Sequence, residues 1–193
     1  MWLAEVFDRE MISPLLLCAL LFQAGPLTAA KPLIENDRVT VWEVTAVRNA
    51  RPVDAVVVSL AGTAEYLPKG ATSKIAGRSI LIELKDHAST AMANTTGYPL
   101  AFPRPGSKKI LENARVIVRD YAWSPGVPTP MHFHDKDVVV VYLDDGELTS
   151  TTPEGQVVVN PYTFGTVRFN LGNRTHTETL TRGKQRAIIT ELK

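Results

Sequence analysis

The sequence lacks almost all of the chemistry that cysteine supplies. Its only cysteine, Cys18, lies in an apolar N-terminal segment, so the remainder of the 193 residues contains no disulfide and no thiolate ligand or nucleophile. The net charge is also small: 21 basic and 20 acidic residues leave a formal net charge of +1, and no block of basic or acidic residues is present. This balance argues against a nucleic acid as partner. Histidine is rarer still, with four residues, so any imidazole chemistry depends on very few positions.

The N-terminal segment differs from the rest of the chain. Residues 11–30 read MISPLLLCALLFQAGPLTAA, an apolar run that ends in small residues before Lys31. This is the pattern of a secretory signal, and the run is too short and too broken by Pro26 to favour a membrane span. We therefore expect residues 1–30 to be a signal peptide and the protein to be periplasmic or extracellular, with no membrane contact after cleavage. The alternatives are an N-terminal helix packed on the body and an uncleaved anchor.

After Lys31 the chain consists of short runs rich in β-branched residues, separated by Gly, Pro, Asn and Asp. This pattern predicts an all-β sandwich or barrel. Residues 88–111, rich in Ala, Thr, Gly and Pro, are predicted to form a linker. The runs that we expect to be strands are Val39–Val47, Ala55–Leu60, Ser79–Leu84, Arg115–Tyr121, Val138–Leu143, Gln156–Val159, Thr166–Phe169 and Arg186–Leu192.

The chain also resembles itself in three segments that recur in the same order. The offsets between the copies are 77, 83 and 108 residues, so the second copy carries insertions relative to the first. We interpret residues 31–87 as a degenerate repeat of residues 112–193, and chance similarity between β-rich strings is the alternative. The matching pairs are Glu35–Val39 with Glu112–Val116, Asp54–Leu60 with Asp137–Leu143, and Arg78–Lys85 with Arg186–Lys193.

Three of the four histidines fall in the inserted segments. His132 and His134 are two residues apart, so their side chains share one face of an extended backbone. His176 lies in another strand-like segment. Convergent imidazoles are typical of a divalent-metal site, although a single histidine is more often structural or exposed. His87 matches no pattern and is interpreted as a surface residue.

Residues 126–146 resemble the first motif of the cupin family, G-x5-H-x-H-x3,4-E-x6-G. Gly126, His132, His134 and Gly146 occupy its positions, and Gly165 and His176 keep the spacing of the second motif, G-x5-P-x-G-x2-H-x3-N. The resemblance implies a double-stranded β-helix, or jelly-roll barrel, in which residues 112–193 hold a divalent transition metal such as Fe, Zn, Mn, Cu or Ni. It also implies either a homodimer or a pairing of the two halves within one chain.

The chain departs from both motifs. The family glutamate falls at Val138 or Val139, and Leu171, Asn173 and Leu180 replace the proline, glycine and asparagine of the second motif. Three of the four usual ligands therefore remain.

Two carboxylates are candidates to replace the missing ligand. Asp137 shares a strand face with Val139, and Glu178 shares a face with His176. Each is a candidate metal ligand, a residue that orients a histidine, or a base. For Asp137 the competing interpretation is a structural acid, because it matches Asp54 in the metal-free copy. By the same parity Tyr142 is expected to face away from the metal.

These observations predict an exported metal-binding protein that takes a small organic ligand or substrate. If it is an enzyme, the three histidines suit a dioxygenase, another oxidoreductase, an isomerase or a hydrolase, and Glu178 is the candidate catalytic residue. The first alternative is a non-enzymatic module that binds a small molecule or the metal. The second is a structural relic of the barrel without metal.

Overall fold

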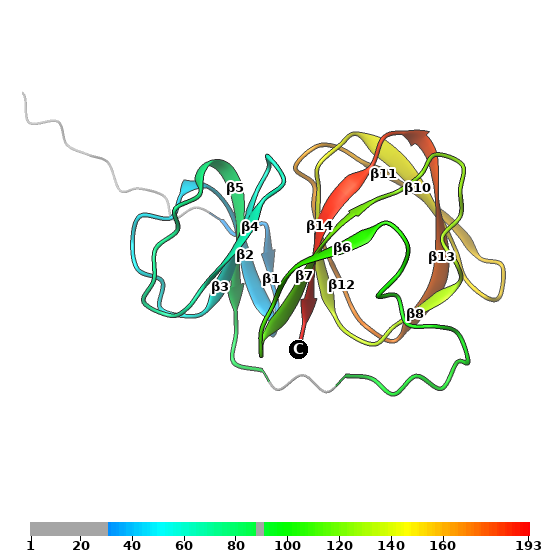
Figure 1. The fold of residues 1–193 in the computed structure, drawn as a ribbon, viewed down its shortest axis with the longest axis horizontal. Coiled ribbons are helices and arrows are strands. Elements are labelled where there is room, and N and C mark those ends of the chain that lie inside the picture. The colour runs from blue at the N-terminus through cyan, green and yellow to red at the C-terminus, as the bar shows by residue number, and fades with distance from the viewer. Residues whose placement is uncertain (1–30, 88–90) are drawn as a thin grey trace, which may run out of the picture. The chain divides into compact units, whose positions relative to one another are not determined.

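A computed structural model describes residues 31–87 and 91–193, so the predicted signal peptide, residues 1–30, lies outside the described part of the chain. The described residues form fourteen strands in three sheets, all paired antiparallel within the sheets (Figure 1). The predicted all-β class is therefore confirmed. No helix long and apolar enough to cross a membrane occurs in the described ranges.

The N-terminal half forms one five-stranded sheet with the order β1-β2-β5-β3-β4. Its central strands are apolar on both faces, which is why the β-branched runs predicted them. The strands are β1 (Ile34–Glu35), β2 (Val39–Ala46), β3 (Ala55–Ser59), β4 (Ala64–Leu67) and β5 (Ala76–Leu84).

The C-terminal part forms a barrel from two sheets, with the orders β12-β9-β14-β7-β6 and β11-β10-β13-β8. Side chains from both sheets, including Val138, Val140, Leu148, Leu180 and Ile189, share one apolar cluster between them. The strands are β6 (Ser107–Glu112), β7 (Val116–Ala122), β8 (His132–His134), β9 (Val138–Tyr142), β10 (Gly146–Thr151), β11 (Val157–Tyr162), β12 (Val167–Asn170), β13 (Arg174–Gly183) and β14 (Arg186–Leu192).

The two five-stranded sheets follow the same strand order. β1, β2, β5, β3 and β4 correspond in sequence to β6, β7, β14, β9 and β12, and both series appear in that order across their sheets. The register agrees as well, because Val39 pairs with Leu84 as Val116 pairs with Leu192. Within residues 31–87 no strand corresponds to β8, β10, β11 or β13, the strands of the sheet that carries the three histidines.

The N-terminal sheet packs on the β12-β9-β14-β7-β6 sheet of the barrel. One cluster of buried residues includes Val41, Val56 and Ile82 from the first and Val139 and Ile188 from the second. The contact is therefore between sheet faces, not along an edge. It stabilises both halves, because each would otherwise expose an apolar sheet surface to water.

Two ion pairs cross between the halves at equivalent positions. Arg38 lies 3.7 Å from Asp137, and Arg115 lies 3.3 Å from Asp54. Arg38 is the repeat counterpart of Arg115, and Asp54 is the counterpart of Asp137. Each half thus donates the arginine of one pair and the carboxylate of the other.

The last part of the segment predicted as a linker joins the barrel. β6 begins at Ser107, and the backbone before it lies beside β8: the Phe133 N–H donates to Pro99 O at 2.8 Å, and the Ala101 N–H donates to Phe133 O at 2.8 Å. Phe102 is buried in the barrel cluster. Pairing with β8 therefore orders a stretch whose composition is typical of a loop, and it brings Phe102 and Arg104 to the cavity inside the barrel.

Candidate metal centre

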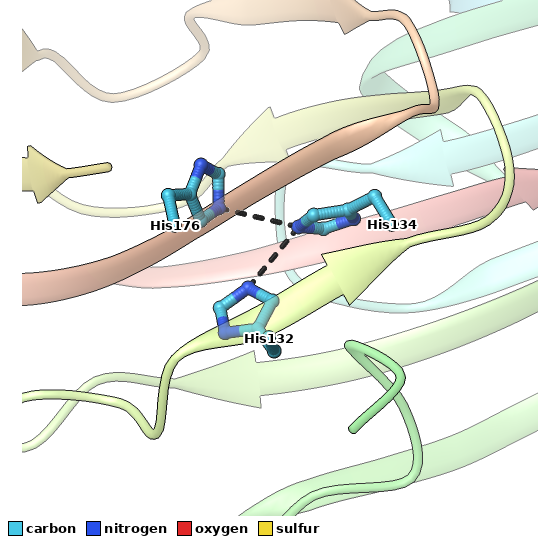
Figure 2. A group of neighbouring side chains, drawn as sticks. All are labelled: His132, His134 and His176. Carbon is cyan, nitrogen blue, oxygen red and sulfur yellow. Dashed lines mark hydrogen bonds between the residues drawn. The ribbon is translucent and has the colours of Figure 1, made fainter. Parts of the chain in front are cut away.

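The three histidines come from two paired strands of the barrel. His132 and His134 lie on β8, and β13 pairs with it antiparallel so that His176 is opposite His132 and Arg174 is opposite His134. Because alternate residues share a face, all three imidazoles point to one place (Figure 2). The intervening Phe133 points to the other side and is fully buried, which fixes the orientation of β8.

The spacing of the ring nitrogens fits a metal ion. His134 Nε2 lies 3.2 Å from His132 Nε2 and 3.2 Å from His176 Nε2 (Figure 2). Ligands at about 2.0–2.1 Å from one ion, separated by angles between octahedral and tetrahedral values, lie about 2.8–3.4 Å apart. The two separations from His134 therefore match ligands of a single ion, and all three potential ligand atoms lie within 4.8 Å of one another. They form the one cluster of potential ligands found among the described residues.

The tautomer of His132 suits a ligand. Its Nδ1–H donates to Pro130 O at 2.7 Å, so the lone pair lies on Nε2, the atom that faces the other histidines. Pro130 belongs to a segment held against β13, where the Thr129 N–H donates to Glu178 O at 2.8 Å and the Glu178 N–H donates to Thr129 Oγ1 at 2.9 Å. This pairing positions the carbonyl that orients the imidazole.

The electrostatic environment keeps the imidazoles neutral. Burial, with the nearby Arg104 guanidinium, lowers the pKa of His132 to about 4. Burial together with Arg174 and Arg104 lowers the pKa of His176 to about 3. The pKa of His134 is lowered well below its ordinary value, chiefly by burial. At neutral pH all three imidazoles are therefore uncharged, which is the state that metal coordination requires.

The structure separates the two carboxylates that the sequence proposed as a fourth ligand. Asp137 Oδ1 accepts the Gly172 N–H at 2.7 Å, and Asp137 faces Arg38, so it lies outside the histidine cluster. The reason is parity on β9. Asp137 and Val139 point toward the N-terminal sheet, whereas Val138 lines the cavity beside the histidines. Of the two positions for the missing glutamate, Val138 is the one that faces the centre.

The prediction for the orientation of Tyr142 was wrong for the same reason. This side chain was expected to face away from the metal, but it lines the cavity together with Val138 and Val140. Its ring stacks on that of Tyr162, with the ring centroids 3.8 Å apart.

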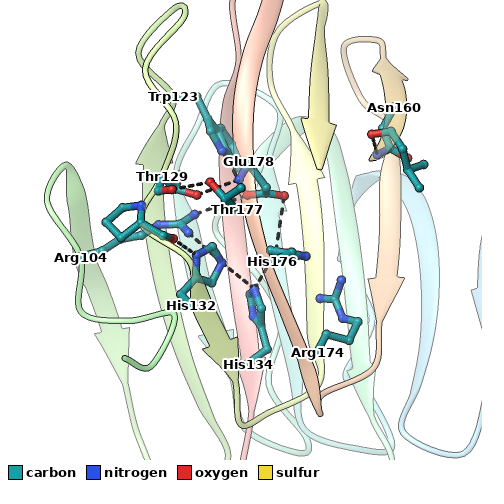
Figure 3. A network of polar contacts seen from close by, with 12 residues as sticks. Arg104, Trp123, Thr129, His132, His134, Asn160, Arg174, His176, Thr177 and Glu178 are labelled. Atoms are coloured by element: carbon teal, nitrogen blue, oxygen red, sulfur yellow. Dashed lines mark hydrogen bonds and ion pairs between the residues drawn. The ribbon is translucent and has the colours of Figure 1, made fainter. Parts of the chain in front are cut away.

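Glu178 lies at the centre, as expected. Its Oε1 is 3.9 Å from His176 Nε2, and its Oε2 is 3.7 Å from Arg104 Nη2 (Figure 3). The Trp123 indole N–H donates to the same Oε2 at 3.2 Å. The carboxylate is thus within reach of a bound ion after a small side-chain movement, and it is paired in the meantime with a guanidinium.

Arg104 is a residue of the centre that the sequence did not indicate. Its Nη1 lies 3.2 Å from His132 Nε2, and its guanidinium sits over the rings of Tyr121 and Phe102, 4.1 and 4.8 Å from their centroids. No signal could have found it, because it lies in the Pro- and Gly-rich segment interpreted as a linker. Arg174 could have been found, since it stands two residues before His176 on the same strand face.

A cavity of about 250 Å³ adjoins the centre. Its walls carry apolar and aromatic side chains and a set of hydrogen-bonding groups, a composition typical of a small-molecule site. The polar lining residues are Arg104, His134, Ser150, Thr152, Gln156, Asn160, Asn170, Arg174, His176 and Glu178.

Comparison with known proteins places this geometry in context. No family model matches the chain. A curated relative, the β-alanine degradation protein BauB of Pseudomonas aeruginosa, is 49% identical over 45 residues, which are 23% of this chain and 47% of BauB. The match thus spans about half the length of that relative.

Several solved structures similar to the chain are named as cupin proteins. A cupin domain from Bordetella pertussis Tohama I is 29% identical, covering 47% of this chain and 97% of that domain, with a TM-score of 0.42. A cupin 2 conserved barrel domain protein from Leptotrichia buccalis is 12% identical, and the match covers 84% of this chain and 87% of that protein, with a TM-score of 0.45. The chain's own structure shows a barrel of two antiparallel sheets with three histidines gathered inside it.

Proposed function

We propose that His132, His134 and His176 hold a divalent transition metal and that the centre acts on a small organic molecule bound in the adjoining cavity. The observation that carries this proposal is the pair of 3.2 Å separations that His134 Nε2 makes with the two other Nε2 atoms. Three neutral nitrogen donors suit iron, zinc, copper, nickel or manganese. Such an ion supplies Lewis acidity, or a site for dioxygen or substrate, at its open positions.

The protein residues around the centre have distinct roles in this proposal. Glu178 is positioned to accept or donate a proton, because its carboxylate lies beside His176 and is oriented by Trp123 and Arg104. The apolar wall formed by Val138 and Val140 excludes water from one side of the cavity. The reaction classes that fit are oxidation by dioxygen and isomerisation.

Metal content tests the first part of the proposal. The protein is purified without a histidine tag, and its metal is measured by elemental analysis beside His132→Ala, His176→Ala and the control His87→Ala, whose side chain is exposed. We expect near-stoichiometric metal in the wild type and in the control, and its loss in the two other variants. An absence of metal even after reconstitution, or its retention in both variants, would contradict the proposal.

A non-catalytic binding module is the second candidate function. It is supported by Val138, which places an apolar side chain where the cupin motif has a metal-binding glutamate. Removing the metal from the purified protein distinguishes a binding module from an enzyme. A binding module is still stabilised by its ligand after metal removal, whereas an enzyme no longer turns over its substrate.

We also propose that the protein is exported. The support is the apolar segment of residues 11–30 and the small residues at its end. N-terminal sequencing of the protein from the producing cells tests this, with cleavage after Ala30 expected and an intact N-terminus contradicting it.

A further inference from the structure

The cavity beside the histidines contains more positive than negative charge. Its charged lining residues are Arg104, Arg174 and Glu178, and the histidines that line it are neutral. Glu178 lies 3.7 Å from Arg104, so these two charges are paired. The charge that is left over belongs to Arg174, and a bound divalent cation would add to it. An anionic occupant therefore compensates a charge that the protein leaves uncompensated.

Arg174 is held in place for such an occupant. Its Nε–H donates to Leu171 O at 2.6 Å, which anchors the side chain and leaves the two terminal Nη groups for another partner. Among the described residues, no carboxylate forms an ion pair with it; Glu178 and Asp137 act only from a greater distance to raise its pKa against the stronger lowering by burial. A half-buried guanidinium without a carboxylate partner is unusual, because no opposite charge offsets its desolvation. A bound anion would supply that charge.

Strand register places this arginine beside the proposed metal. Arg174 pairs with His134 across β13 and β8 and shares its strand face with His176 (Figure 3). Directly opposite residues in an antiparallel pair have Cβ atoms about 5 Å apart. Arg174, His134 and His176 also line one cavity, so a molecule held there by the guanidinium occupies the space that adjoins the histidines, and Asn160 and Asn170 line the same cavity.

We propose that Arg174 is the receptor for the carboxylate of a small organic acid that occupies this cavity. The planar guanidinium offers two parallel N–H donors that match the two oxygens of a carboxylate, a geometry that lysine and asparagine lack. The cavity volume of about 250 Å³ limits the occupant to a small molecule. The inference names the substrate class of the proposed centre, and it rests on that proposed function for the reaction but not for the binding.

The test compares propanoate with its neutral analogue propanamide, by NMR titration of the full protein in metal-free and metal-loaded forms. We expect propanoate to bind the wild type more tightly than propanamide, and Arg174→Gln to weaken propanoate about 10- to 100-fold while leaving propanamide unchanged. The control is Arg182→Gln, which removes the same charge from an exposed position on the same strand and is expected to change neither affinity.

Measuring metal binding and propanoate binding separately, in the wild type and in Arg174→Gln, distinguishes a failure of this inference from a failure of the metal proposal. If the wild type binds no metal but metal-free protein still prefers propanoate through Arg174, the metal proposal fails and the carboxylate receptor stands. If metal binds and propanoate affinity is the same in Arg174→Gln and wild type, the receptor is overturned. If Arg174→Gln does not fold, Arg174→Lys replaces it and is expected to weaken propanoate several-fold. Equal binding of propanoate and propanamide to the wild type overturns the inference without any variant.

Discussion

Acid should destabilise the metal-free protein through the same burial that prepares the histidines for metal. An unfolded histidine has a pKa near 6.5, whereas His132 and His176 titrate in the folded protein at about 4 and about 3. The unfolded chain therefore binds more protons than the native one below pH 6.5, and stability falls as the pH falls through this window. Above pH 6.5 both states hold neutral imidazoles and the effect vanishes.

The magnitude follows from the shifts. Each pKa unit corresponds to about 1.4 kcal/mol, so lowering the pH from 7 to 5 costs about 2 kcal/mol for each of the two histidines. The full effect, reached only near pH 3, is on the order of 8 kcal/mol for the pair, comparable with the whole stability of an ordinary domain. His134 acts in the same direction, because its pKa is lowered as well.

The assay is urea unfolding at pH 7 and pH 5 after removal of metal, followed by tryptophan fluorescence. Replacing His176 by Gln removes one titrating group, so the loss of unfolding free energy between the two pH values should shrink by about 2 kcal/mol. Carboxylates elsewhere titrate equally in both proteins and cancel in this difference. The reasoning is refuted if His176→Gln loses as much unfolding free energy between pH 7 and pH 5 as the wild type does. The matched control is His87→Gln, which replaces an exposed histidine.

Three further predictions follow from the centre and the core. Val138→Glu places a carboxylate in the cavity beside His134 and His176, so metal affinity measured by competition with a chelator should rise about tenfold or more, and the metal-free melting temperature should fall. Arg104→Met removes a cation next to His132 Nε2 and should raise divalent-metal affinity about tenfold, whereas Arg182→Met at the surface should not; equal affinities would contradict the assigned electrostatic role. Ile188→Ala, in the core shared by both halves, should lower the free energy of unfolding by about 2–5 kcal/mol and leave one cooperative unfolding transition. Two separate transitions would show that the halves unfold independently.

Much of the fold was predictable because the central strands are apolar on both faces. All eight β-branched runs correspond to strands, among them β3 and β9, in which every residue is buried. The six strands outside these runs are very short or polar, and the sequence indicated two of them, β8 and β13, only through the histidine segments. β13, for example, alternates Arg174, His176 and Glu178 toward the cavity. A strand that lines a polar cavity lacks the hydrophobic pattern on which strand prediction depends.

The histidine cluster could be predicted because its ligands are set by local spacing. The fourth position could not, because β9 is buried on both faces and its sequence carries no sign of which face meets the cavity: Val139 packs on the N-terminal sheet and Val138 on the centre. Arg104 was out of reach for another reason. Its position depends on the pairing of residues 99–101 with β8, a contact between segments that are distant in the sequence and share no local pattern.

The sheet of residues 34–84 has a consequence for how the barrel behaves on dilution. It covers the β12-β9-β14-β7-β6 face with an apolar surface, and its ion pairs with that face are reciprocal, Arg38 with Asp137 and Arg115 with Asp54. If a separate subunit supplied this cover, mass action would remove it at low protein concentration. Because the cover belongs to the same chain, its local concentration is fixed by the connection between β5 and β6. The barrel therefore keeps this face out of water at any concentration of the protein.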